Sequence, residues 1–293
     1  MRVTDRMIYD NASLWTGNAR SQVEAATETA ATGLRIVHPG DDPAAAGQIT
    51  VHQQAQARAD AIGKSVQAAS DELGSADGAL AAVGNAVARA RELAVQLSTS
   101  TYTAAQRAAA ANEVAGLFNE AVSALNTKVG NRYLFGGGKD SQPPFDSAGV
   151  YQGDTLVRQV EAAPGVLQNA SVRADVAAKG TGGGVDLLST LQALATALSA
   201  NDIPGVQGTL DNLDAGTAQL STARATAGAD QSALDQAHSI ALAASTSEKA
   251  AVSHLQDADI VASATQLQLA QRAFEAALQS STASFQLSLA TTK

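Results

Sequence analysis

The chain is predicted to be mainly α-helical: an elongated antiparallel bundle or coiled coil formed by both chain ends, with a small β-rich insertion in the middle. Three observations support this fold class. About a fifth of the 293 residues are alanine, the strongest helix former, and only 3% are aromatic. Long helix-compatible stretches occupy both ends of the chain. Between positions 139 and 184 the composition changes to proline, glycine and β-branched residues.

The first helix is expected over residues 4–32. Gly33 can end it, because glycine readily adopts the left-handed backbone of a helix C-terminus. Residues 34–40 then indicate an extended connector closed by a Pro-Gly turn. The next helix starts with Asp42 as N-cap, since its carboxylate can accept free first-turn amides, and with Pro43 at the first helical position. The predicted connector and capping residues are therefore Gly33, Pro39, Asp42 and Pro43.

Helical patterning continues to about residue 125, with a Thr/Ser-rich break over residues 98–103. Within the insertion, Ser171–Ala177 alternates apolar and polar side chains, which predicts a half-buried strand. A helix resumes at Asp186 and the helical pattern persists to the end of the chain. If the insertion caps the far end and the second half returns antiparallel, both termini meet. The predicted domains are a terminal coiled-coil core (1–40 with 255–293), a helical rod (41–139 with 185–254) and a β-rich outer domain (140–184).

The last predicted helix carries an apolar stripe but almost no charge. Ile260–Thr292 contains only Arg272 and Glu275 as charged residues, and its other faces are Gln, Ser, Thr and Ala. Such faces tolerate both water and close contact with another chain, so they suit assembly. The alternative is a poorly charged core helix. The stripe follows a heptad spacing through positions 260, 264, 267, 271, 274, 278, 281 and 285.

Composition excludes several classes of function. The net charge of −9 and the lack of any Lys/Arg cluster argue against nucleic acid as a partner. No apolar run approaches the roughly 20 residues of a membrane span. Cysteine is absent, which excludes disulfides and thiol catalysis. The first residues are polar where a signal peptide needs an apolar run, so secretion would have to occur without a cleaved signal peptide.

Residues that could carry chemistry have simpler interpretations. Gly136–Lys139 is similar to part of a phosphate-binding loop, but Tyr133 replaces its first glycine and Asp140 its Mg²⁺-binding hydroxyl, so a flexible domain junction is favoured. The four histidines lack metal-ligand spacing and are expected to be solvated. Asp41 and Asp42 precede a proline, which favours helix capping over acid–base chemistry. We therefore predict no catalytic, metal or cofactor site, and no enzyme.

Six short motifs resemble the flagellin superfamily and follow its order along the whole chain. The opening residues Arg2–Thr4 and Arg6–Met7, together with the Asp-Asp-Pro turn, look more like the hook-associated branch at the hook–filament junction than like filament flagellin. The motifs are Gly33–Ile36, Pro39–Ala46, Arg132–Gly137, Tyr151–Asp154, Arg224–Gly228 and Asp257–Asp259.

The resemblance implies a structural protein of the bacterial flagellum, exported by the flagellar type III route and located outside the cell. It would form an adaptor ring of copies between hook-associated protein 1 and flagellin, and an export chaperone would bind its C-terminal helix. Trp15 would anchor packing against a neighbouring subunit. The alternatives are flagellin forming the filament itself and, more distantly, an enzyme on a helical scaffold. The predicted assembly interface comprises Met7, Ile8, Leu14, Trp15, Ile260, Leu267, Phe274, Leu278 and Phe285.

Overall fold

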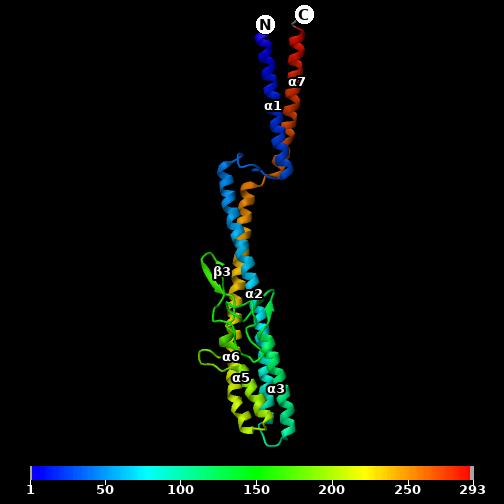
Figure 1. Ribbon diagram of the computed structural model, residues 1–293. Helices are drawn as coiled ribbons and strands as arrows, with labels where there is room; N and C mark the ends of the chain where they lie inside the picture. Colours follow the sequence, from blue (N-terminus) through cyan, green and yellow to red (C-terminus); the bar gives the residue numbers. More distant parts are fainter. Residues whose placement is uncertain (1, 291–293) are drawn as a thin grey trace. The chain divides into compact units, whose positions relative to one another are not determined.

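The computed structural model describes residues 2–290, apart from the side chains of residues 2–5, 8, 284, 285 and 287–290. Helices dominate this part of the chain and the strands form two small hairpins, which confirms the predicted mainly α fold with a small β insertion (Figure 1). None of the described helices combines the length and apolar character needed to cross a membrane. The elements are α1 (Arg2–Thr32), α2 (Pro43–Leu97), α3 (Ala104–Leu125), β1 (Lys128–Val129), β2 (Arg132–Tyr133), β3 (Gln159–Ala163), β4 (Val166–Asn169), α4 (Ala174–Ala177), α5 (Leu187–Ser199), α6 (Ile203–Gln256) and α7 (Ile260–Ala290).

The chain divides into two compact units, and the division falls inside α2 and α6. The first unit comprises Met1–Arg58 and Ala244–Lys293, and the second comprises Ala59–Ala243. In the first unit, α1 packs along α7 in antiparallel orientation, so the first and last helices lie side by side (Figure 1). The start of α2 and the end of α6 share a small apolar core in the same unit. This core contains Ile36, Ala45 and Ile49, packed by Val252 and Leu255.

The second unit contains a helical bundle with a leucine-rich interior. α3 packs against α5, and both share one apolar core with α2 and α6. Local signals set the helix starts: Thr103 and Gln106 form a reciprocal capping box at α3, and the Asp186 carboxylate accepts the Ser189 amide at α5. Within the helices that start at these caps, leucines recur on the inner faces, where they are fully buried. The largest of these side chains include Leu80, Leu125, Leu191, Leu194, Leu198 and Leu213.

The insertion differs from its prediction in where the strands lie. The strand expected over Ser171–Ala177 is wrong: Ala174–Ala177 forms α4, with Arg173 at the N-cap position. Ala170, Ala174, Ala177 and Ala178 are buried. Their spacing of three to four residues is that of a helical turn, so the apparent alternation was accidental. The actual hairpin is β3–β4, which turns through Pro164–Gly165 and packs Val160 and Ala162 against α2 and α6.

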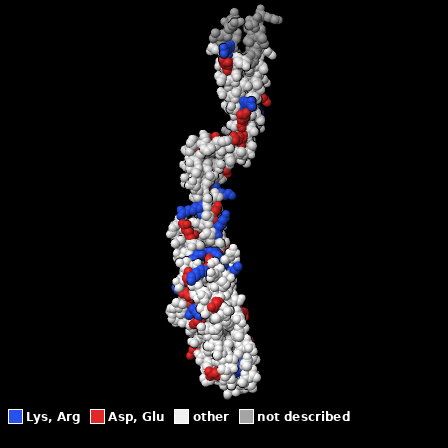
Figure 2. Space-filling model, in the orientation of Figure 1, with Lys and Arg blue, Asp and Glu red and all other residues white. Residues whose placement is uncertain are grey.

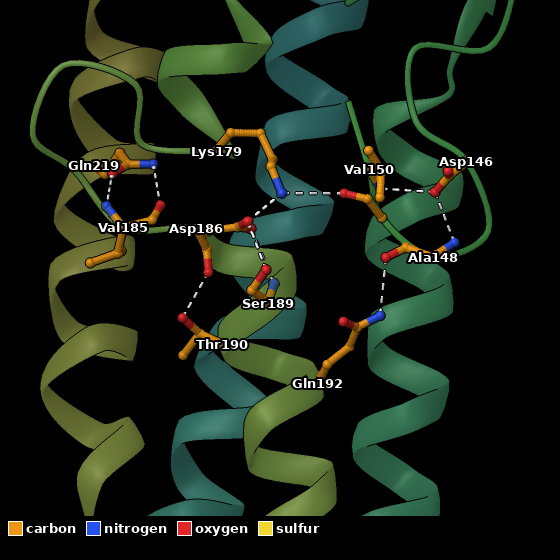
Figure 3. Close-up of polar contacts among 11 residues, drawn as sticks. Asp146, Ala148, Val150, Lys179, Val185, Asp186, Ser189, Thr190, Gln192 and Gln219 are labelled. Carbon is orange, nitrogen blue, oxygen red and sulfur yellow. Dashed lines mark hydrogen bonds and ion pairs between the residues drawn. The ribbon is translucent and has the colours of Figure 1, made fainter. Parts of the chain in front are cut away.

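Polar contacts attach the loops of the insertion to α5 and α6 (Figure 3). Lys179 pairs with Asp186, and the Lys179 ammonium also reaches the Gly149 carbonyl at 3.5 Å. Burial disfavours the charged form of Asp186, but bonds from Lys179 and Ser189 outweigh it and lower the pKa of this carboxyl. The Gln219 amide donates to the Val185 carbonyl and accepts from the Val185 amide, at 3.1 and 2.9 Å. The insertion is thus held by fixed polar bonds as well as apolar packing.

Candidate assembly surface

The α1–α7 pair meets along a seam of small side chains. On α1, Ala12 and Ala19 are buried and Thr16 and Val23 are half-buried. These four residues follow a heptad spacing along the helix. On α7, the side chains with the same spacing are Ser263, Leu267, Ala270, Phe274, Ala277 and Ser281. Because most of these groups are small, the two helices can approach closely but bury little apolar area between them.

Large apolar side chains of the same two helices point away from the seam. Trp15 is 64% exposed, Ile260 is 78% exposed and Leu278 is 42% exposed. Met7 and Leu14 are exposed as well. Few charged groups interrupt the face of this pair that Figure 2 presents. A solvated helix of a monomer normally carries charge at such positions, so these apolar residues make this surface the candidate for contact with another chain.

The structure divides the predicted interface residues between the two faces. Leu267 and Phe274 lie half-buried in the seam with α1, whereas Ile260 and Leu278 are exposed. The side chains of Ile8 and Phe285 lie outside the described residues. Sequence reasoning missed further exposed apolar groups, because a single heptad stripe was assumed to form one face. The missed residues are Tyr9, Val261 and Leu269.

The connectors at the base of the pair contain the predicted capping residues. Gly33 has φ +69° and its amide donates to the Thr29 carbonyl at 2.9 Å. Pro39 lies inside a turn in which the Asp41 amide donates to the His38 carbonyl at 3.0 Å. The Asp42 carboxylate accepts the Ala45 amide at 3.0 Å, and Pro43 is the first residue of α2.

Asp41, beside the N-cap, closes the first connector. One of its carboxylate oxygens accepts the amides of Val37 and His38, at 3.0 and 2.8 Å. The bond from His38 and then that from Val37 favour the ionised carboxylate, and they lower the pKa of Asp41. The ionised Asp41 carboxylate therefore binds two backbone amides of the connector.

The glycine run after β2 is not the flexible junction that its composition predicted. Gly137 has φ +66°, and the Gly138 amide donates to the Asp154 carboxylate at 2.7 Å. A Cβ at Gly137 would lie 2.2 Å from the same carboxylate. The loop is therefore a tight turn, and its Gly138 amide already binds the Asp154 carboxylate of the same chain.

Two of the four histidines, His52 and His238, are less solvated than predicted, whereas His38 and His254 are exposed. His52 Nδ1 lies 2.6 Å from the Glu248 carboxylate, and both side chains are about one-third exposed. His238 Nδ1 lies 3.1 Å from the Gly63 carbonyl in a part-buried position. These partners lie far away in sequence, so a local pattern could not predict them. No group of three or more potential metal ligands occurs within the described residues.

Two motifs of the sequence resemblance come together around Tyr151. Its hydroxyl lies 3.0 Å from the Phe135 carbonyl and 2.8 Å from the Asp154 carbonyl, and its ring packs against Phe145. Burial, with the nearby carboxylates of Asp175 and Asp154, raises the pKa of Tyr151 to about 12. Tyr151 therefore stays protonated and holds the glycine turn to the bundle.

Comparison with known proteins shows what the chain is similar to. Residues 3–140 match the family described as the bacterial flagellin N-terminal helical region. A protein of Escherichia coli named flagellar hook-associated protein 3 is 32% identical over 166 residues, 55% of this chain and 52% of its own length. The protein of the same name in Salmonella typhimurium is 30% identical over 167 residues, 56% of this chain and 53% of its own length.

The chain spans about half the length of these two relatives. A solved structure titled flagellar hook associated protein-3, from Legionella pneumophila, superposes with a TM-score of 0.62. The superposition covers 71% of this chain and 98% of that chain at 15% identity, so it shows the shared fold alone. The predicted resemblance to the flagellin superfamily, and within it to hook-associated protein 3, is confirmed.

Proposed function

We propose that this chain is a structural subunit of the bacterial flagellum that joins the hook to the filament. Copies of the chain would form an adaptor ring between hook-associated protein 1 and the first flagellin subunits, outside the cell. The similarity to two proteins named flagellar hook-associated protein 3 supports this assignment. No catalytic step is part of the proposed role.

The exposed apolar face of the α1–α7 pair is the observation that carries the proposal. Fully burying a Leu, Ile or Phe side chain contributes roughly 1.5–3 kcal/mol. Trp15, Ile260 and Leu278 are all at least 42% exposed, so much of that free energy is still available to an assembly. In a ring, each copy would gain it, and the gain would repeat around the ring.

The same reasoning suggests roles for the parts of the chain. The terminal residues 1–40 and 255–293 would form the inner core, residues 41–139 with 185–254 the rod, and residues 140–184 the outer domain. The low charge of α7 also suits a segment that an export chaperone covers before secretion. Export would then use the flagellar type III route, without a cleaved signal peptide.

Deletion of the gene in the source bacterium tests the proposal. Cells should keep their hooks, lack attached filaments and release flagellin into the medium, because the template for filament growth is missing. Plasmid-borne wild-type gene should restore attached filaments, which controls for effects on neighbouring genes. Normal attached filaments in the deletion strain would exclude the adaptor role.

Filament flagellin is the second candidate, favoured by the match of residues 3–140 to the flagellin N-terminal helical region. The two candidates differ in where the protein accumulates. Immunogold labelling of isolated flagella should give a single short band at the filament base for an adaptor. Label along the whole filament would instead support flagellin.

A further inference from the structure

The two connectors of the first unit are hydrogen-bonded to each other. The Arg35 amide donates to the Gln256 carbonyl at 2.7 Å, and the Ala258 amide donates to the Gly33 carbonyl at 2.8 Å. Leu34 and Asp257 are paired between these bonds as an antiparallel bridge. The segment that follows α1 and the segment that precedes α7 are thus joined at one fixed pairing.

Side chains reinforce this pairing. The Arg35 guanidinium donates to the Leu255 carbonyl at 2.8 Å and lies 3.6 Å from the Asp42 carboxylate. It therefore contacts both the last turn of α6 and the N-cap of α2. The Gln256 amide donates to the Ile36 carbonyl at 3.3 Å, while the Ile36 side chain is 4% exposed in its apolar core. Local bonds and local packing hold the connectors in the same arrangement.

Packing within the α1–α7 seam, by contrast, does not fix the register of the two helices. Counting equally far along both helices from the Leu34–Asp257 pairing places Ala19 near the level of Phe274 and Ala26 near that of Leu267. A shift by one heptad brings Ala12 to Phe274 and Ala19 to Leu267. Alanine still faces the same large residue, so packing distinguishes the two registers weakly.

We infer that the paired connectors, through Arg35, Gln256 and the Leu34–Asp257 bridge, set the register of the α1–α7 pair. Arg35 and Gln256 are thus positioning residues for the terminal helices. A slip by one heptad displaces one helix by about 10 Å along the other, which the bridge prevents while it is formed.

This inference deepens the proposed function, on which its biological meaning rests. Trp15 on α1 and Leu278 on α7 lie at nearly the same level in the observed register. The register therefore fixes how far apart the exposed apolar groups of the two helices lie along the pair. A heptad slip would displace Trp15 and Leu278 by about 10 Å relative to each other and change that spacing.

Disulfide trapping in the full-length, purified chain tests the register, because the chain contains no cysteine of its own. Thr16→Cys with Ala277→Cys reports the observed register. Thr16→Cys with Ala270→Cys, and Val23→Cys with Ala277→Cys, report slips in the two directions. A disulfide needs Cβ atoms about 3.5–4.5 Å apart, so each pair forms in only one register. Gel mobility of the oxidised monomer measures the yield.

In the parent chain, the observed-register pair should cross-link about tenfold more than either slipped pair. Arg35→Ala with Gln256→Ala should lower that ratio by about threefold or more. Insertion of two glycines between Ala258 and Asp259, which uncouples the paired connectors from α7, should do the same. Arg20→Ala with Gln22→Ala is the matched control, since both residues are exposed on α1 away from the connectors.

An unchanged ratio in both connector variants would overturn the inference, and so would equal cross-linking of all pairs in the parent chain. Loss of every cross-link in the connector variants would also overturn it, since the connectors would then hold the helices together without selecting a register. No flagellar partner takes part in the test. Its failure therefore leaves the proposed function standing, and failure of the deletion test leaves the register result standing.

Discussion

The α1–α7 pair and the helical bundle of the second unit are both built from alanine-rich helices, yet their interiors differ. The bundle encloses fully buried leucines such as Leu125, Leu191 and Leu213. The seam of the terminal pair buries Ala12, Ala19 and Ala270, with half-buried Leu267 and Phe274 as its larger members. Among the side chains that the structure describes, most of the large apolar groups of the pair face outward instead.

This difference separates folding from assembly. Apolar burial contributes roughly 25 cal/mol per Å², so the leucine bundle can offset the entropy of its own ordering. An alanine seam buries too little apolar area to offset the ordering entropy of its helices. Long helices gain most of their stability from such packing. We therefore expect the second unit to be stable alone and the terminal pair to gain order when its outer face is covered.

The largest effect should come from the bundle interior. Leu191→Ala should lower the free energy of unfolding of the second unit by about 2–5 kcal/mol, because it leaves a cavity among fully buried side chains. Urea denaturation of the purified chain measures the loss. Leu269→Ala, at an exposed position of α7, is the matched control and should stay within about 0.5 kcal/mol of wild type. Equal losses in both variants would remove the distinction between the regions.

A buried cation at the end of the bundle should give the next effect. The Arg107 side chain donates to the Leu97 carbonyl at 3.1 Å and to Asn201 Oδ1 at 2.6 Å, and the residue is 3% exposed. Arg107→Met should cost about 1–3 kcal/mol for each buried group left unpaired. Arg89→Met removes an exposed guanidinium as a control. If the melting temperature of Arg89→Met falls as far as that of Arg107→Met, the burial of Arg107 is not the cause of the stability loss.

The outward face of the terminal pair should affect assembly with little effect on folding. Trp15→Ala with Leu278→Ala should prevent filament attachment, while the unfolding free energy of the second unit changes by less than about 0.5 kcal/mol. Ile240→Ala with Val166→Ala makes comparable changes at exposed positions of the second unit and should leave motility intact. Motility and calorimetry together check the result. Normal filaments in the Trp15 and Leu278 double variant would show that this face is not used.

The smallest effect concerns acid. The pKa of Asp41 is lowered in the folded chain, so its stabilising contribution is fully present above its unfolded value of about 3.9 and disappears as pH falls through the lowered pKa. Amide protection at Val37 and His38 should therefore decrease below about pH 4. Hydrogen exchange measures this, with Asp41→Asn expected to abolish the pH dependence. Protection that stays constant down to pH 2 in the wild type would contradict the assignment.

The sequence predicted features whose causes lie within a few residues. A carboxylate three residues before an amide can cap a helix whatever the rest of the fold, as predicted for Asp42, which accepts the Ala45 amide. The break at 98–103 and the change of composition after residue 139 are equally local. The strand expected over Ser171–Ala177 failed because alternation over so few residues also fits one helical turn.

By itself, then, the sequence predicted the mainly helical fold, the Asp42 cap and the resemblance to the flagellin superfamily. Tertiary structure alone decided which face of α7 meets α1, where His52 finds Glu248 and how Asp154 occupies the glycine turn. The physical reasons are the weak difference in polarity between the faces of α7 and the long sequence separation of the bonded residues. A helix of Ala, Ser, Thr and Gln has no strongly preferred buried face until a partner chooses one, and bonds between residues far apart in the chain leave no local signal.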